Sequence, residues 1–235
     1  MKPTLLRRVV AEFFGTMLLL AAVVGSGIMG DRLAAGNVAL ALLANTLATG
    51  AALVAIILAF GPVSGAHLNP AVTLADAWMG GMRWREAFAY LAAQIVGAFA
   101  GVAVAHLMFG LAVVEVSTKQ RSGPAQIFSE FVATFGLMAV IWGCARTRAA
   151  AAAFAVGAYI TAAYWFTAST SFANPAVTMA RAMTNTFAGV RPMDVAPFVG
   201  AQLAGALGAT LLFQWLTPGV KAEASAVLVR QAGLP

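Results

Sequence analysis

Long runs of apolar residues, separated by short polar breaks, follow one another along most of the chain. Six of these runs reach about 20 residues, the length that a helix needs to cross the hydrocarbon core of a bilayer. They span approximately residues 9–29, 38–60, 87–109, 125–144, 149–166 and 195–216. The first run is longer than the apolar core of a signal peptide and carries Glu12, so we interpret it as a retained helix. The pattern predicts an all-α membrane protein with six transmembrane helices.

Two shorter apolar segments begin with the same three residues, Asn69-Pro70-Ala71 and Asn174-Pro175-Ala176. Asn is a strong helix N-cap, and Pro is favoured at the first helical position because its missing N–H would be unpaired there anyway. Each apolar run after the proline is about nine residues long, which is too short to cross a bilayer. Because unpaired backbone cannot face lipid, such segments need a protein-lined cavity. We therefore expect two re-entrant half-helices around a pore.

Composition supports the membrane assignment. Hydrophobic residues make up 61% of the 235 residues and charged residues 9%, against about 25% charged residues in soluble domains. The single Cys144 excludes an intramolecular disulfide, and with only two histidines a metal site is not expected. The net charge of +6 comes from scattered residues between apolar spans, which favours loop anchoring over nucleic-acid binding.

The basic residues also predict an orientation. If the N-terminus is cytoplasmic, nine basic residues fall in cytoplasmic segments and four in external loops. The cytoplasmic group is Lys2, Arg7, Arg8, Arg83, Arg85, Arg146, Arg148, Lys221 and Arg230, and the external group is Arg32, Lys119, Arg121 and Arg191. This bias predicts that both termini are cytoplasmic.

The two halves of the chain resemble each other. Three markers recur in the same order: a Glu-Phe pair at Glu12 and at Glu130, the Asn-Pro-Ala segments, and an Ala-Gln pair at Gln94 and at Gln202. Since each half has three spans, the second half enters the membrane from the opposite side. Residues 1–235 then form one domain built from inverted repeats, approximately 1–109 and 125–217, with the site expected near the midplane at their interface.

Several polar residues within the apolar spans have a structural and a functional interpretation. Glu12 and Glu130 are costly in a membrane unless they have partners. A proton relay is one interpretation. We favour the other, in which they accept hydrogen bonds from backbone N–H groups or from His67 and hold the re-entrant loops. Gln94 and Gln202 are expected to tie the loops to the helices, and His67 to fix its loop with one edge toward the pore.

With these motifs in place, the chain resembles the aquaporin and aquaglyceroporin family, the major intrinsic proteins. The resemblance covers nearly the whole chain and is closest to bacterial aquaglyceroporin-like channels associated with arsenic resistance. It implies a right-handed helical bundle, a pore in each subunit and a homotetramer in the bacterial inner membrane. It also implies that the two glutamates support the re-entrant loops.

The resemblance further locates a selectivity filter. In this family, the residue after the second Asn-Pro-Ala is usually Arg, but here it is Val177. Spacing from the motifs gives Thr49, Ala162 and Ser171 as the other filter positions. This ring holds no aromatic residue and no cation, so we expect a wide filter. Arg181 lies one helical turn beyond Val177, where it either supplies positive charge farther out or anchors the helix end.

These features predict a passive channel for small uncharged solutes. The favoured solutes are neutral metalloid hydroxides (arsenite, antimonite and, as an extension, methylated arsenicals) and glycerol, with some water. The alternatives are an ordinary water and glycerol facilitator, an ion-coupled secondary transporter, which also uses inverted repeats, or a non-conducting structural role. No nucleophile–base pair or nucleotide loop is evident, so we expect no enzymatic activity and no cofactor.

Overall fold

The computed structural model describes residues 3–217, apart from the side chains of residues 146 and 147. Within that range all regular secondary structure is helical, as the sequence predicts. The elements are α1 (Leu5–Leu33), α2 (Val38–Ser64), α3 (Pro70–Trp78), α4 (Trp84–Met108), α5 (Pro124–Thr147), η1 (Ala149–Ala151), α6 (Ala152–Phe166), α7 (Pro175–Arg181) and α8 (Pro192–Leu216). Lys2, Lys221 and Arg230 of the predicted charge bias lie outside the described residues.

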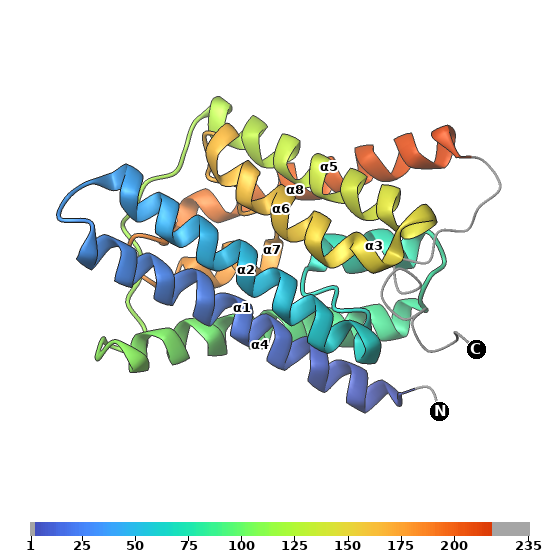
Figure 1. Cartoon of the computed structure of the whole chain (residues 1–235), viewed down its shortest axis with the longest axis horizontal. Coiled ribbons are helices and arrows are strands. Elements are labelled where there is room, and N and C mark those ends of the chain that lie inside the picture. Colours follow the sequence, from blue (N-terminus) through green and yellow to red (C-terminus); the bar gives the residue numbers. More distant parts are fainter. Residues whose placement is uncertain (1–2, 218–235) are drawn as a thin grey trace.

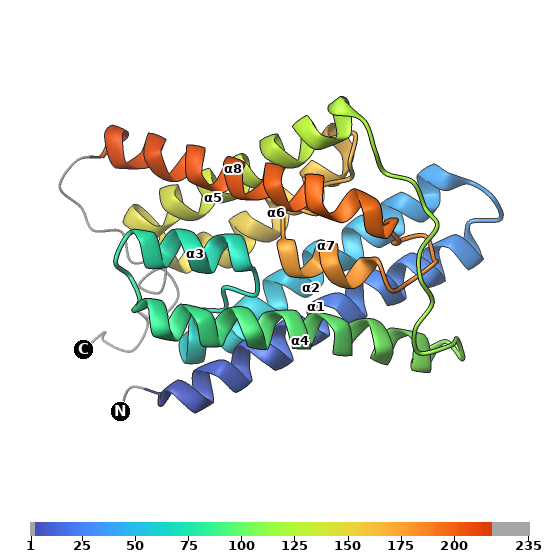
Figure 2. The same cartoon turned by 180° about the vertical axis from the view of Figure 1, so that it is seen from behind.

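In the described part of the chain, six helical segments are long and apolar enough to cross a membrane, so the protein is an integral multi-pass membrane protein. They form a bundle in which α1 packs along α4 and α2, α5 packs along α8, and α2 crosses α6 (Figure 1). The short helices α3 and α7 lie end to end in the middle of the bundle, between α4 and α8 (Figure 2). The two predicted half-helices are therefore enclosed by the long ones.

Small residues allow the long helices to approach closely. A Cβ atom added at Gly97 of α4 would overlap the carbonyl oxygen of Phe13 in α1. In the second half of the chain, a Cβ at Gly205 of α8 would overlap the carbonyl oxygen of Phe131 in α5. Backbones in contact gain packing interactions that lipid tails cannot offer. Gly97 and Gly205 thus mark two places where long helices are in backbone contact.

The end of α2 differs from the prediction. The second apolar run was expected to end near residue 60, before the pair Gly61-Pro62, but α2 continues to Ser64. Pro62 lies two residues before the last helical residue and removes only one hydrogen bond of the helix, so the final turn persists. Gly65 ends the helix with a left-handed φ of 90°, a conformation that glycine adopts without steric cost. The longer α2 places Ser64 beside the first re-entrant loop.

Candidate functional site

The site begins at the junction of the two half-helices, where their cap asparagines bind each other's loops. The Asn69 Oδ1 atom accepts a hydrogen bond from the Ala71 N–H at 2.9 Å, and its Nδ2 donates to the Ala173 carbonyl at 2.8 Å. Asn174 repeats this pattern, capping the Ala176 N–H at 3.0 Å and donating to the Leu68 carbonyl at 2.8 Å. One N–H of each amide is therefore used in holding the opposite loop. The second remains to face the cavity that both asparagines line.

The loops before the asparagines have unusual backbone. In the first loop Ala66 and Leu68 have φ values of 46° and 51°, and in the second loop Ser171 and Ala173 both have 49°. Left-handed conformations cost a non-glycine residue about 1–2 kcal/mol each. The surroundings compensate for this strain, because the loop N–H groups point toward a buried glutamate. Two of the loop carbonyls, those of Leu68 and Ala173, point toward the opposite asparagine.

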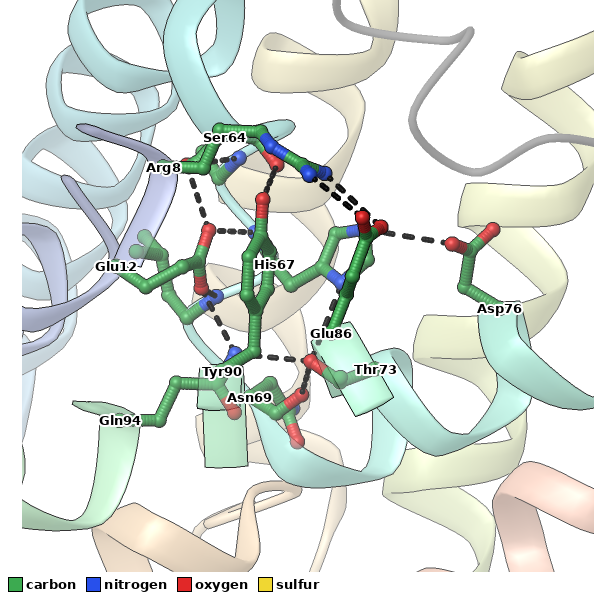
Figure 3. A network of polar contacts seen from close by, with 12 residues as sticks. Arg8, Glu12, Ser64, His67, Asn69, Thr73, Asp76, Glu86, Tyr90 and Gln94 are labelled. Atoms are coloured by element: carbon green, nitrogen blue, oxygen red, sulfur yellow. Dashed lines mark hydrogen bonds and ion pairs between the residues drawn. The ribbon is translucent and has the colours of Figure 1, made fainter. Parts of the chain in front are cut away.

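Glu12 of α1 organises the first loop (Figure 3). Its carboxylate accepts hydrogen bonds from the backbone N–H of His67 at 2.9 Å and of Leu68 at 2.7 Å. The hydroxyl of Ser64 and the amide of Gln94 donate to the same carboxylate at 2.7 and 2.8 Å. A fully buried carboxylate with four donors is well compensated. Its contacts are those expected of a group that fixes a loop.

Glu130 of α5 has the corresponding place in the second half. It accepts from the N–H groups of Phe172 and Ala173 at 2.8 and 2.9 Å, and from Gln202 at 2.6 Å. Gln202 also donates to the hydroxyl of Thr178 in α7 at 2.8 Å. Each glutamine therefore joins a long helix, a glutamate and a half-helix, since Gln94 makes the same bond to Thr73 of α3 at 2.9 Å.

His67 lies between the first loop and the cavity. Its Nδ1 atom is 3.1 Å from the Thr73 hydroxyl, and its Nε2 atom is 3.9 Å from a carboxylate oxygen of Asp76. The ring packs edge-on against Tyr90 (Figure 3). These contacts fix the orientation of the imidazole, and His67 is among the residues that line the cavity described below.

A mainly apolar cavity extends from the junction along both half-helices. The centres of water-sized molecules can occupy about 90 Å³ of it. One enclosed water needs only about 10–15 Å³ by this measure. Thr49, Ser171 and Val177 line the cavity, together with both cap asparagines. The hydroxyl oxygen of Ser171 is buried and has no hydrogen-bond partner among the described residues. Three of the four expected filter positions therefore meet in one cavity.

The fourth expected position is wrong. Ala162 is exposed on the outer face of α6 and does not line the cavity. The lining residues of α6 include Val156, Ile160 and Tyr164, which are spaced four apart and share one helix face. Ala162 lies two residues from Ile160 and from Tyr164, and this spacing turns it to the opposite face. Counting back from Asn174 missed this, because the non-helical loop between α6 and Asn174 breaks the helical register.

The cavity also contains the aromatic residues and the cation that the predicted ring lacked. Tyr164 and Phe172 line it, and the Tyr164 hydroxyl is 3.5 Å from that of Thr49. Arg181 at the end of α7 lines it as well, with its side chain 2% exposed. The spacing of Tyr164 from Val156 and Ile160 was a signal that could have identified it.

Arg121 is a further residue whose place the sequence did not reveal. It was counted among the charges of the external loops, but it is only 8% exposed. Its guanidinium donates to the carbonyls of Gly189 at 2.8 Å and of Ser169 at 3.2 Å. It also lies 5.1 Å from the ring centre of Phe172, and burial lowers its pKa. Arg121 therefore joins three loops around the outer end of α7.

Comparison with known proteins identifies the architecture. The pattern of the family described as major intrinsic protein matches residues 1–152. Aquaglyceroporin AqpS of Rhizobium meliloti (strain 1021) is 58% identical over 212 residues, which cover 90% of this chain and 91% of the relative. Aquaporin NIP1-4 of Oryza sativa subsp. japonica is 36% identical over 217 residues, covering 89% of this chain and 78% of the relative.

A solved structure has the same fold. The aquaglyceroporin from Plasmodium falciparum superposes with a TM-score of 0.71 at 19% identity, covering 92% of this chain and 98% of that chain. The fold, the paired Asn-Pro-Ala segments and the sequence matches agree. The chain belongs to the major intrinsic protein family, which contains the aquaporins and aquaglyceroporins.

Proposed function

We propose that this protein is a passive channel for small uncharged solutes, and that neutral metalloid hydroxides and glycerol are its favoured solutes, with some water. The observation that carries the proposal is the cavity where the two half-helices meet. Both cap asparagines and Val177 line this cavity, and none of its lining residues is Asp or Glu. A pathway with hydrogen-bonding groups but no anionic site suits neutral solutes with hydroxyl groups better than ions.

The half-helices support the exclusion of cations. α3 and α7 both begin at their cap asparagines, so their N-terminal ends carry positive partial charge at the junction. A cation or a hydronium ion is repelled there. A neutral solute instead offers lone pairs to the second N–H of Asn69 and of Asn174.

Val177 supports the preference for solutes larger than water. It lines the cavity at the position where the family usually has the long, charged Arg. A valine at this position leaves room and adds an apolar wall. Glycerol and the trihydroxy forms of arsenic and antimony are similar in size and in the hydroxyl groups that they present. The name of the 58% identical relative, an aquaglyceroporin, agrees with the glycerol part of this proposal.

The test is to measure solute flux in proteoliposomes with the wild type and with Val177→Arg. Stopped-flow swelling would report water and glycerol permeability, and direct uptake would report arsenite. We expect the added guanidinium to reduce glycerol and arsenite flux by about tenfold or more, as a modest change in pocket size can. Water flux should fall less, because water is smaller.

The control is Val113→Arg, which adds the same charge at an exposed loop valine. It should leave all three fluxes unchanged. Equal flux of every solute in liposomes with and without the wild-type protein would reject the channel proposal. A uniform effect of Val177→Arg on all solutes would reject only the role of Val177 in selection.

The same experiment separates a channel from an ion-coupled transporter. A channel gives flux that rises linearly with solute concentration and needs no proton or sodium gradient. The transporter would need coupling-ion ligands near the midplane. The buried groups available for this, Glu12 and Glu130, already accept hydrogen bonds from their loops, which favours the channel.

We also propose that the channel works as a homotetramer in the bacterial inner membrane, with both termini in the cytoplasm. The family resemblance supports the tetramer with a pore in each subunit. Large apolar side chains such as Leu47, Phe88 and Trp165 are exposed on the long helices. Lipid and neighbouring subunits are the partners that such a surface suits.

A further inference from the structure

Arg181 is a buried cation that lacks a complete set of partners. It is the last residue of α7, and its side chain is 2% exposed. The Nε atom donates to the carbonyl of Ala188, whereas Nη1 has no hydrogen-bond partner within residues 3–217. Among the described residues, no carboxylate forms an ion pair with it. Burying a guanidinium without a full set of hydrogen bonds and without a carboxylate partner costs free energy. A buried arginine at this position therefore calls for a reason beyond packing.

The contacts of Arg181 fix the side chain in the cavity wall. Its guanidinium carbon lies 3.4 Å from the ring centre of Phe172, a cation–π contact. Phe172 is itself held, because its ring packs edge-on against Phe198 at 5.4 Å and lies 5.1 Å from the guanidinium of Arg121. With Nε bound and the plane set by the ring, the direction of the remaining N–H groups is set too.

Arg181 lies away from the junction of the two half-helices. α7 begins at the junction and ends at Arg181, so the arginine lies at the opposite end of this half-helix (Figure 2). It follows Val177 by four residues, which puts both on one helix face, and both line the cavity. A solute that moves along α7 therefore passes Val177 and the guanidinium in succession.

Anchoring alone does not account for these observations. The bond to Ala188 and the contact with Phe172 would anchor the helix end, but neither uses the Nη1 donor. The charge gains the contact with the Phe172 ring, but the Nη1 donor adds cost without a hydrogen bond to any described residue. Both become useful when a neutral solute in the cavity accepts a hydrogen bond, because hydrogen bonds from a charged donor are the strong ones.

We infer that Arg181 is a selectivity residue of this channel: its guanidinium donates hydrogen bonds to solute oxygens and repels cations, one helical turn outward of Val177. The Phe172 ring forms the adjoining aromatic wall. The inference rests on the proposed channel function and extends it. The pathway would then combine a wide position at Val177 with a narrower, positively charged position beyond it. A filter of this kind admits solutes larger than water without losing the exclusion of ions.

Two substitutions separate the charge of Arg181 from its hydrogen-bonding geometry. Arg181→Gln keeps an N–H donor and removes the charge, so potassium current through planar bilayers should rise about tenfold or more above that of the wild type. Arg181→Lys keeps the charge and loses the flat, two-pronged donor. It should still exclude potassium, but its glycerol flux should change by about tenfold relative to its water flux.

Arg32→Met provides the control. Arg32 also lies over an aromatic ring, 5.2 Å from the centre of Phe109, and also donates to a backbone carbonyl, but it is exposed and does not line the cavity. Potassium exclusion and solute ratios should be unchanged in this variant. A purely structural role of Arg181 predicts that Gln and Lys lower thermal stability and all fluxes together.

The outcomes distinguish this inference from the proposed function. Wild-type protein without solute flux would reject the function itself. Wild-type flux combined with unchanged potassium exclusion in Arg181→Gln and unchanged solute ratios in Arg181→Lys would reject only the role of Arg181. If Arg181→Gln does not fold, the ratio of glycerol to water flux in Arg181→Lys decides, and an unchanged ratio overturns the inference.

Discussion

Glu12 and Glu130 illustrate how a single residue can hold a strained loop. Neither side chain is exposed, and the bonds to their carboxylates come from loop N–H groups, glutamine amides and, at Glu12, a serine hydroxyl. The cost of the left-handed residues and the cost of burying the charge are met by the same set of hydrogen bonds. This favours a structural role over a proton relay, because the lone pairs are already engaged.

Removing one of these carboxylates should therefore destabilise the protein. In Glu130→Ala, the N–H groups of Phe172 and Ala173 and the Gln202 amide lose their acceptor. At about 1–3 kcal/mol for each buried unpaired group, we expect a loss of roughly 4 kcal/mol or more in unfolding free energy. The thermal unfolding midpoint in detergent measures this change.

Glu115→Ala is the matched control for this substitution. Glu115 is exposed in the loop after α4, so its removal should change the unfolding free energy by no more than about 0.5 kcal/mol. Equal midpoints for the two variants would contradict the role of Glu130.

Individual positions differ in how far the sequence predicted them. Asn69 and Asn174 were expected to cap α3 and α7, and local chemistry is enough for that, because Asn followed by Pro favours a helix start. Ala162 was placed wrongly. Its exposure depends on the rotation of α6 against its neighbours, which spacing from a distant motif does not determine.

At the scale of the elements, close contacts between helices depend on glycine, which has no side chain to keep the backbones apart. Gly205 and Gly200 both belong to α8, yet they have different surroundings. A Cβ at Gly205 would overlap the α5 backbone, whereas one at Gly200 would meet no atom of the described residues within 4 Å. The two glycines thus form a matched pair within one helix.

Gly205→Ala should separate α5 from α8 and lower the unfolding free energy by about 1–3 kcal/mol, the usual cost of overpacking. Gly200→Ala should leave it unchanged or raise it by up to about 1 kcal/mol, because alanine is the better helix former. Thermal unfolding in detergent compares the two. A larger loss at Gly200 than at Gly205 would show that the packing is not limiting.

For the whole molecule, the equivalent networks around Glu12 and Glu130 lead us to infer that the halves are inverted repeats, as the three sequence markers predict. The helices of each half follow the same order: two long helices, a half-helix and a third long helix. The half-helices meet end to end in the middle of the bundle, where each cap asparagine binds the other half's loop. The site is therefore shared equally by the two halves.

The predicted orientation can be tested at the two ends of one helix. Arg85 is exposed at the start of α4, and Val113 is exposed beyond its end. The helix has 25 residues and is thus about 37 Å long, enough to put them on opposite sides of the membrane. In a Cys144→Ser background, a membrane-impermeant maleimide should label Val113→Cys in intact spheroplasts.

The same reagent should label Arg85→Cys only after permeabilisation, if the N-terminus is cytoplasmic as the basic residues predict. Cys144→Ser alone provides the unlabelled control. Labelling of Arg85→Cys in intact spheroplasts, with Val113→Cys protected, would reverse the orientation.

The sequence by itself determined the class and the plan of this protein. Apolar runs of membrane length, two Asn-Pro-Ala segments and buried carboxylates are local signals, and each acts through short-range physics: hydropathy, helix capping and the cost of burying charge. The tertiary structure decided which side chains face the cavity. Tyr164, and not Ala162, lines the cavity, and Arg121 and Arg181 are buried around Phe172. These outcomes depend on helix rotation and loop packing, which are set by contacts between segments far apart in the chain.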